Sequence, residues 1–483
     1  MLPIHFGLQD YIPYVLYASA IAALLLSVFW RPIVGVFYLL PLIPLQSLRY
    51  RLNDLPLGAS VFGVMLVGIA VGLWRSGQPV FPKNGWFKLL AVYFVFTFFS
   101  LCLGSSYLGT SLPLPGNSRF GNWQEYMVMP ALCIMTAAVI RTKREIRLLV
   151  LMICLGTLLL DKSFWSAISD RDFSTYTDEL HNEGGNMGYA GSNGLAAFTA
   201  QASIFLLALA GFERKYSVRL AYYGLATYSA ICLMYSLSRG GYVAFLVGCF
   251  VIGLLKQRKL LVLLGIFLLT WTDIVPPAVQ QRVEMTYDQQ SGSLDGSSET
   301  RLSLWTNAMQ VFDSHEVLGT GFDTYAYMHL NKGNFGGYYA DTHNYFVKML
   351  VETGVVGLAL FLCILGGIVS EGYRLWRRAR DPFFASLGLG IIGWLVCSIV
   401  ANLFGDRWTY LQVNGYMWVI AGLVCKAYEF EKNNHSEEEA VIFSDGKVEE
   451  SRQTEPNGDG PDGPSSEDWQ PASADAGWSP NRI

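Results

Sequence analysis

The chain has 483 residues, of which 52% are hydrophobic and only 15% are charged. Soluble domains carry roughly 25% charged residues, so this composition argues against a soluble protein. Apolar runs long enough to cross a bilayer recur between short charged breaks, which indicates an all-α, polytopic membrane protein. The formal net charge of −4 says little about partners, because much of the acid lies near the C-terminus.

The apolar runs predict about 12–13 transmembrane helices and one long outer loop that contains short helices. These helices are expected near 11–29, 32–48, 58–74, 86–104, 123–141, 146–162, 194–212, 218–237, 241–256, 259–275, 346–370, 383–404 and 410–427. The first ten residues lack the basic region and the cleavage site of a secretory signal, so the first run should remain in the protein as a helix. The eight cysteines fall in or at the ends of apolar runs and form neither a disulfide framework nor a zinc-binding spacing.

Three parts follow from this pattern. Residues 1–162 form N-terminal transmembrane helices, and residues 163–429 form a transmembrane core with its outer loop at 276–345. Residues 430–483 are rich in Ser, Gly, Pro, Asp and Glu and poor in apolar residues. Such a segment cannot bury a core, so we expect a disordered acidic cytoplasmic tail.

Basic loops predict the orientation, because Lys and Arg in short loops mark the cytoplasmic side. The strongest basic loops are at 141–147, 214–219, 256–259 and 374–380. The long polar segments 163–193 and 276–345 then lie outside. Arg49 and Arg51 would also lie outside, against this trend, so the loops leave the orientation of the first third open.

Several motifs lie on the predicted outer side. The eighth helix ends in Ser238-Arg239-Gly240-Gly241, where an arginine is disfavoured and the glycines allow close backbone approach to a ligand. A snorkelling interfacial arginine is the simpler interpretation of Arg239. In the long loop, Arg301 begins a run whose apolar residues repeat at helical intervals, which predicts a short amphipathic helix. Taken alone, Arg301 is typical of a solvated helix residue.

The end of the outer loop carries two further motifs. The turn Leu318–Tyr325, with sequence LGTGFDTY, includes Asp323 and could be loop geometry alone. Asp341-Thr342-His343-Asn344 then leads into a helix that carries Glu352. His343 lies where a polar loop meets the membrane surface, and histidine has the pKa that suits proton transfer near neutrality.

The order of these motifs resembles the O-antigen ligase family, integral-membrane glycosyltransferases that include related polymerases and protein O-glycosylation ligases. The resemblance runs from about 185 to 370 and includes Tyr189–Ala196, similar to the family's asparagine-containing segment that opens a helix. It implies that Arg239, Arg301 and His343 are catalytic. The weaker matches, expected to bind substrate or shape the site, are Asn193, Asp323, Asn344 and Glu352.

The resemblance also implies the substrates. The donor is a glycan on a polyprenyl diphosphate such as undecaprenyl diphosphate, and the acceptor is a hydroxyl of a lipid, a protein or a sugar in surface polysaccharide or lipopolysaccharide biosynthesis. The expected location is the bacterial inner membrane, with the site facing the periplasm or exterior. The residues suggest no cofactor and no metal; Asp341 and His343, two positions apart, are a weak alternative cation site. No nucleic acid is expected as a partner.

Other functions stay open at this point. A repeat-unit polymerase of O-antigen or exopolysaccharide has nearly the same motifs, although the single loop histidine favours a ligase. A transporter of lipid or polysaccharide should carry its charges at the membrane midplane, whereas these cluster on one outer side. A structural scaffold would not need three cationic or titratable groups on one face.

Overall fold

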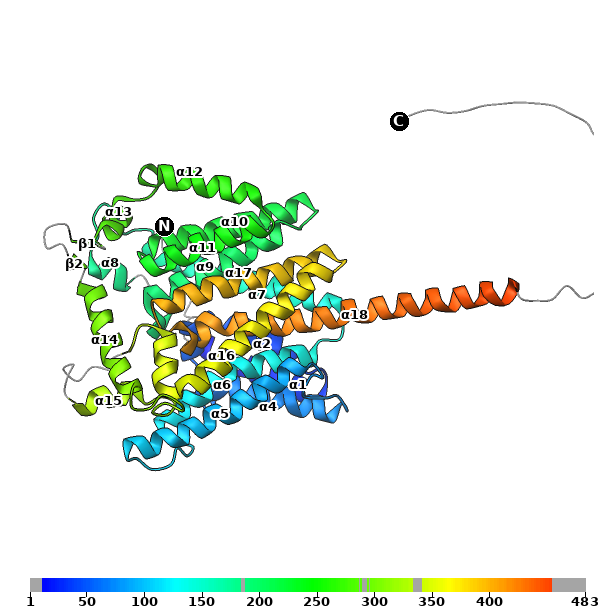
Figure 1. The fold of residues 1–483 in the computed structure, drawn as a ribbon, viewed down its shortest axis with the longest axis horizontal. Helices are drawn as coiled ribbons and strands as arrows, with labels where there is room; N and C mark the ends of the chain where they lie inside the picture. The colour runs from blue at the N-terminus through cyan, green and yellow to red at the C-terminus, as the bar shows by residue number, and fades with distance from the viewer. Residues whose placement is uncertain are drawn as a thin grey trace, which may run out of the picture. The chain divides into compact units, whose positions relative to one another are not determined.

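The computed structural model describes residues 11–183, 187–285, 287–288, 293–294, 296–332 and 341–453. The chain divides into two units, Met1–Lys432 and Asn433–Ile483. In chain order the helices are α1 (Ile12–Phe29), α2 (Ile33–Leu42), α3 (Gln46–Tyr50), α4 (Val61–Arg75), α5 (Gly85–Leu108), α6 (Ser118–Val139), α7 (Lys143–Ile168), α8 (Asp178–Glu183), α9 (Gly191–Ala210), α10 (Tyr216–Tyr235), α11 (Arg239–Leu255), α12 (Arg258–Ile274), α13 (Pro277–Glu284), α14 (Gly296–Phe312), α15 (Tyr325–Lys332), α16 (Tyr345–Arg378), α17 (Pro382–Leu403) and α18 (Leu411–Gln453), shown in Figure 1. Short 3-10 turns lie at Gly58–Ser60, Gly188–Ala190 and Arg407–Thr409, and the two-residue strands β1 (Tyr287–Asp288) and β2 (Ser293–Leu294) pair antiparallel. The predicted all-α class is confirmed.

The long apolar helices make this a multi-pass membrane protein. Within the described residues, seven helices are long and apolar enough to cross a membrane. An eighth results if α12 and α13, bent by 109° at their junction, form one span. This number is below the 12 or 13 expected. The reason is that α2 and α11 are apolar but short, and that α6, α10 and α18 carry more polar residues.

Side-chain caps fix where several of these helices begin. Asn84 and Asn117 accept hydrogen bonds from backbone N–H groups at the starts of α5 and α6. Thr142 and Glu145 form a capping box at the start of α7, each accepting a backbone hydrogen bond from the other's residue. Asp381 caps α17 in the same way as the asparagines. These caps satisfy N–H groups that have no partner within the helix.

One predicted helix is broken in two. The expected run 32–48 forms α2 and α3, with Pro44 between them. Proline has no backbone N–H and restricts the residue before it, so the helix ends there and a new one starts at Gln46. Gln46 and Tyr50, which follow this break, line a cavity together with residues of α6, α15 and α16.

Helix α9 forms the centre of the core unit. It packs against α10, α11 and α17, and nearly every one of its side chains is buried. Helix α16 packs on α17 and α5, so the α16–α17 hairpin joins the N-terminal helices to the core. The starts of α9, α11 and α16 and the end of α17 all reach one end of the bundle, and these ends carry the motifs singled out in the sequence.

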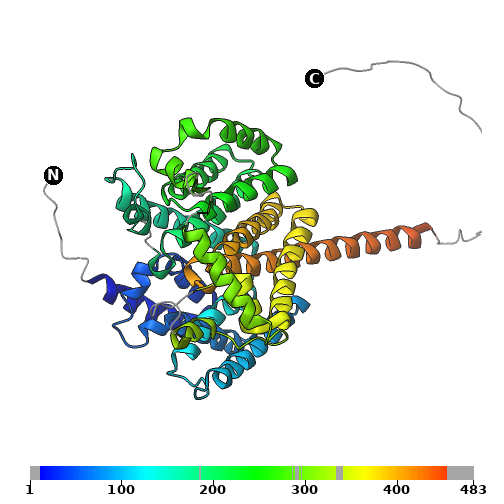
Figure 2. The ribbon, with the colours of Figure 1, turned by 60° about the vertical axis from the view of Figure 1, so that its left-hand side comes forward.

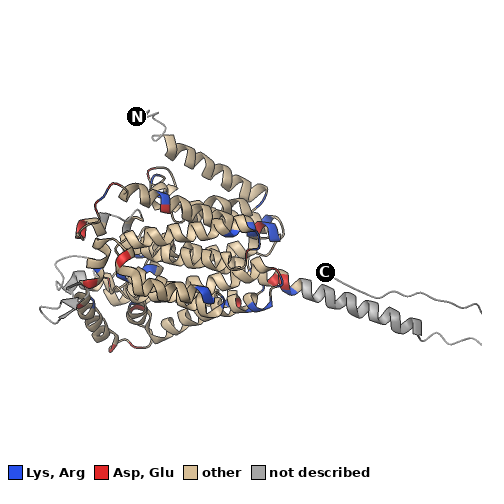
Figure 3. Ribbon diagram, turned by 90° about the horizontal axis from the view of Figure 1, so that it is seen from above, with Lys and Arg blue, Asp and Glu red and all other residues tan. Residues whose placement is uncertain are grey.

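The outer-loop helices lie at that end of the bundle. Helices α8, α13, α14 and α15 gather there in Figure 1, and in Figure 2 α14 lies across the front of the bundle. The basic loops gather away from them (Figure 3). Arg147 pairs with Asp381 at 2.6 Å, which joins the first and last of these loops. The segregation is the one that the basic loops predicted, although which end faces the cytoplasm stays a prediction.

The C-terminal part continues as helix further than expected. The division at 432 lies close to the predicted boundary at 430, but α18 extends to Gln453, within the segment expected to be disordered. Residues 454–483 lie outside the described residues. For them the disordered acidic tail remains a prediction.

Candidate active site

The turn between α10 and α11 places Arg239. Leu237 adopts a left-handed backbone conformation (φ 56°), which is rare for a branched residue and is typically retained at functional sites. The Ser238 hydroxyl donates a 2.6 Å hydrogen bond to Asn193 Oδ1, so the start of α9 holds the start of α11. Gly241 lies against Ala196 of α9, where a Cβ would approach to 2.6 Å. This glycine therefore allows the close packing of α11 against α9.

A cavity of about 550 Å³ opens beside this turn. It brings together residues from α8, α9, α11, α13, α14, the end of the loop before α16, the end of α17 and the turn after α17. Its lining residues are Asp178, His181, Asn182, Asn193, Ala197, Ser238, Arg239, Gly240, Gly241, Arg282, Met285, Thr300, Arg301, His343, Ala401, Phe404 and Arg407. We call it the arginine cavity. The three residues predicted to be catalytic, Arg239, Arg301 and His343, all line it, and so does Asn193.

The arginine cavity is strongly basic. In the part of the chain that the structure describes, four arginines line it and Asp178 is its one carboxylate. Arg282 lies 4.7 Å over the ring of Tyr176, which fixes its direction, and its Nε has no hydrogen-bond partner among the described residues. A guanidinium group stays charged and can donate two parallel hydrogen bonds to two oxygens of one phosphate, so such a cavity suits a phosphorylated anion.

His343 enters the cavity from a strained turn. Its backbone φ is 50°, in the left-handed region that non-glycine residues rarely occupy. Trp305 Nε1 donates a 2.8 Å hydrogen bond to the Thr342 carbonyl, which anchors this turn to α14. Burial, and then the charges of Arg301 and Arg407, lower the pKa of His343. The imidazole is therefore neutral at neutral pH and can accept a proton.

A second histidine, His181 of α8, lines the same cavity and was not predicted. Its Nδ1 lies 3.1 Å from the Ser236 carbonyl. A carbonyl only accepts hydrogen bonds, so this contact favours the tautomer that is protonated on Nδ1 and leaves Nε2 as an acceptor. Burial lowers the pKa of His181, and the charges of Arg282 and Arg239 lower it further.

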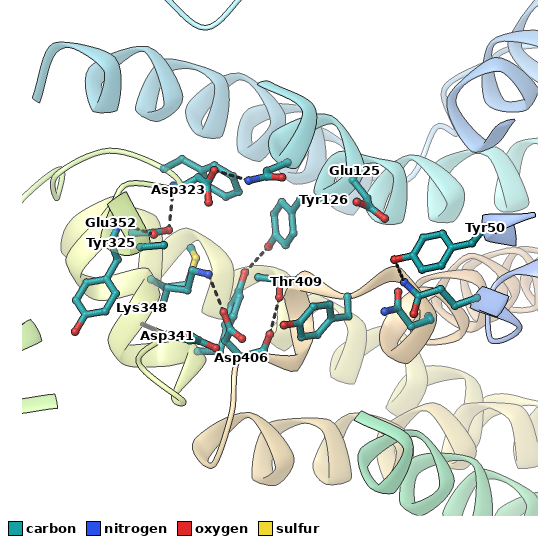
Figure 4. Close-up of a pocket in the computed structure, with 18 residues that line it drawn as sticks. Tyr50, Glu125, Tyr126, Asp323, Tyr325, Asp341, Lys348, Glu352, Asp406 and Thr409 are labelled. Atoms are coloured by element: carbon teal, nitrogen blue, oxygen red, sulfur yellow. Dashed lines mark hydrogen bonds and ion pairs between the residues drawn. The ribbon is translucent and has the colours of Figure 1, made fainter. Parts of the chain in front are cut away.

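Asp323 and Glu352 lie in a neighbouring cavity, also of about 550 Å³ (Figure 4). The Glu352 carboxylate accepts hydrogen bonds from the backbone N–H groups of Asp323 and Tyr325, both at 3.1 Å. Gly354 breaks the helical geometry of α16 about two and a half turns after its start, with φ 66°, and its backbone packs on Val317. Glu352 thus ties the LGTGFDTY turn to α16. We call this second space the carboxylate cavity.

Asn344 lines neither cavity. Its side chain accepts hydrogen bonds from the backbone N–H groups of Phe346 at 3.0 Å and Val347 at 3.3 Å, so it caps α16. Asn344 therefore shapes the site by starting the helix that follows His343, and its contact with substrate stays a prediction. Among the described residues, no group of three or more His, Cys, Asp or Glu side chains could hold a metal ion.

The sequence reasoning missed Arg282, Arg407 and His181. One signal was present: Arg282 and Arg407 both lie on the side expected to be outside, where basic residues are disfavoured. Applied to every outer arginine, the rule that drew attention to Arg239 would have included both. His181 had no comparable signal, because its segment is polar throughout.

The fold defines a polytopic membrane protein, and at one end of its helices lies a cavity lined by four arginines and two histidines. Comparison with protein families matches residues 224–362 to O-antigen ligase, a range that contains Arg239, Arg301 and His343. This match supports the assignment of the chain to the O-antigen ligase family, as the motifs had indicated. No curated protein matches the chain.

Proposed function

We propose that the protein is a glycosyltransferase of the bacterial inner membrane that transfers a glycan from a polyprenyl diphosphate to an acceptor hydroxyl. The observation that carries this proposal is the presence of Arg239, Arg301 and His343 in one cavity, although they are far apart in sequence. We further propose that this end of the bundle faces the periplasm or exterior, since the basic loops lie away from it.

The arginines bind the donor. Diphosphate is the leaving group, and negative charge grows on it as the bond from the anomeric carbon to the phosphate oxygen breaks. Arg239 and Arg301 hold the diphosphate oxygens and stabilise this charge, and Arg282 and Arg407 add to the field from the other walls. In this role the guanidinium groups supply the positive charge that a metal ion supplies in other transferases.

His343 activates the acceptor. Its neutral imidazole accepts the proton of the acceptor hydroxyl as that oxygen attacks the anomeric carbon opposite the leaving diphosphate. The new glycosidic bond forms as the bond to diphosphate breaks, so the configuration at the anomeric carbon inverts. Asn193 positions the Arg239 turn, and Glu352 with Asp323 shapes the neighbouring wall.

A transporter is less well supported by the same geometry. Its charged groups should line a path near the midplane between helices. Here the arginines come from the start of α11, from outer-loop helices and from the turn after α17, all at one end of the bundle.

Complementation tests the proposal. A host that lacks its own ligase or polymerase receives the wild type, His343→Ala or His315→Ala, and surface glycan is resolved by length on a gel. His315 is a matched control, because it also lies in the outer loop but lines neither cavity and packs on Tyr107. We expect glycan transfer to be lost only in His343→Ala. Full-length glycan on a lipid or protein defines a ligase, elongation of single repeats defines a polymerase, and an active His343→Ala refutes the proposed chemistry.

A further inference from the structure

The carboxylate cavity and the arginine cavity share a wall. Asp341 lines the first and His343, two residues later, lines the second. The consecutive residues Asp406 and Arg407 divide in the same way. Two segments of this wall, at 341–343 and at 406–407, therefore each present a carboxyl group to one cavity and a basic side chain to the other. A molecule in the carboxylate cavity lies next to the histidine assigned as base.

The two cavities differ in charge. Among the described residues, the carboxylate cavity is lined by five acidic side chains and by the amine of Lys348. Lys348 Nζ is already paired with Asp406 at 2.7 Å. Among the described residues, this cavity therefore offers a phosphate ester one lysine that is already paired, while the arginine cavity offers it four guanidinium groups. The diphosphate of the donor and the contents of the carboxylate cavity are thus separated by charge.

A buried oxygen atom in the carboxylate cavity lacks a donor. Gln46 is only 2% exposed, and its Oε1 has no hydrogen-bond partner among the described residues. Asp341 and Asp406 are different, because their carboxyl groups are hydrogen-bonded to each other. Burial, and then the charge of Asp341, raise the pKa of Asp406, so this pair can share a proton. Buried polar atoms in proteins are normally paired, so the Gln46 oxygen calls for a ligand that donates a hydrogen bond from a hydroxyl or amino group.

Aromatic rings complete this lining. Tyr50, Tyr126, Tyr345, Phe322 and Tyr410 line the cavity, and Figure 4 shows Tyr126 between Asp323 and Glu125, with Tyr50 at the far side of the lining. The hydroxyl of Tyr126 is hydrogen-bonded to those of Tyr93 and Tyr345, both at 2.6 Å, so these rings are held in place. Flat apolar faces beside hydrogen-bond acceptors suit a molecule with both C–H faces and hydroxyl groups, as a sugar ring has.

We propose that the carboxylate cavity binds the acceptor, and that this acceptor is an unphosphorylated saccharide, neutral or amino-bearing, whose hydroxyl reaches His343 across the shared wall. This inference rests on the proposed glycosyltransferase function and adds the class of acceptor. It excludes a phosphorylated sugar as the group that occupies this cavity during transfer.

The test measures two ligands on the same samples of full-length protein in nanodiscs. Saturation-transfer NMR follows a panel of methyl glycosides: glucoside, galactoside, glucosaminide and N-acetylglucosaminide. A separate titration follows undecaprenyl diphosphate. Gln46→Leu removes one unpaired acceptor and should weaken the bound glycoside about tenfold, the effect of one hydrogen bond, with the diphosphate affinity unchanged. Arg239→Gln should weaken the binding of undecaprenyl diphosphate and leave the affinity for the glycoside unchanged.

Gln201→Leu is the matched control. Gln201 is fully buried in α9, and its amide oxygen and nitrogen also lack partners among the described residues, but it lines neither cavity. It should leave the affinity for both ligands unchanged. A Gln46→Leu protein that loses diphosphate binding as well has lost its fold. The test is then repeated with Tyr50→Ala, which changes another residue of the same cavity.

The outcomes separate the two proposals. Diphosphate binding without binding of any methyl glycoside overturns the acceptor assignment and leaves the donor assignment standing. Glycoside binding that responds equally to Gln46→Leu and Gln201→Leu also overturns it, and so does stronger binding of glucose 6-phosphate than of methyl glucoside to the Arg239→Gln protein. Glycoside binding without any diphosphate binding instead overturns the donor site and with it the proposed function.

Discussion

Removing Arg282 tests whether the arginine cavity acts as a whole. Arg282 of α13 lines the cavity together with Arg239 at the start of α11 and is directed by its 4.7 Å contact with the Tyr176 ring. A hydrogen bond to a charged group contributes about 1.5–3 kcal/mol. If Arg282 makes one such bond to the donor diphosphate, Arg282→Gln should weaken undecaprenyl diphosphate binding about 10- to 150-fold.

The contact with Tyr176 gives a second, smaller magnitude. A cation–π interaction at a partly exposed position contributes about 0.5–1 kcal/mol. Tyr176→Leu keeps the charge of Arg282 but loosens its direction, so it should weaken binding only about two- to fivefold. The double variant should be no weaker than Arg282→Gln alone, because the ring acts through the guanidinium.

The assay is a titration of undecaprenyl diphosphate into the full chain in nanodiscs at low and high salt. The matched control is Arg171→Gln, since Arg171 also lies on the outer side but lines neither cavity and bonds the Ala167 carbonyl. Arg282→Gln should also flatten the salt dependence, which Arg171→Gln should not. Equal effects of the two variants would refute the reasoning.

Three further predictions concern the base, the Arg239 turn and the anchor of the second cavity. Because the Arg301 charge lowers the pKa of His343, Arg301→Gln should raise that pKa. With saturating donor, the acid limb of the kcat–pH profile should then move to higher pH. An acid limb that stays in place contradicts the assignment of His343 as the base. Asn193→Ala removes the 2.6 Å bond from Ser238 and should weaken diphosphate binding about two- to tenfold in the same titration, while an unchanged affinity would show that the turn is held without it. Glu352→Ala leaves two buried backbone N–H groups without an acceptor and should lower the free energy of unfolding by about 2–4 kcal/mol; an unchanged denaturation midpoint would show that the turn does not depend on this carboxylate.

The helices were largely predictable because membrane spans follow from apolar length. The expected runs near 58–74 and 383–404 agree with α4 and α17 within a few residues. Helix starts were less accurate: the run expected at 146–162 begins at Lys143, because Thr142 and Glu145 cap it. That T-x-x-E pattern is visible in the sequence.

The candidate site was predictable in part. Arg239, Arg301 and His343 share a cavity as the resemblance implied. The helix expected to begin at Arg301 is present as α14, but it begins five residues earlier, at Gly296, and is 17 residues long. The second cavity could not be foreseen, because it depends on the break before Gln46 and on the turn that carries Asp406. Neither distant segment has a local pattern that reveals its neighbours in space. Asn344 is a residue whose capping role could have been predicted, because asparagine is a preferred residue at the position before a helix begins.

The most direct measurement of the central claim is glycan transfer by the purified protein in proteoliposomes. A labelled glycan on undecaprenyl diphosphate is the donor, and free undecaprenyl diphosphate and glycosylated acceptor are followed together in wild type, His343→Ala and His315→Ala. We predict that both products form at equal rates in wild type and His315→Ala, and that His343→Ala loses about 10²- to 10⁴-fold in rate while still binding the donor. Transfer by His343→Ala at the wild-type rate would contradict the account.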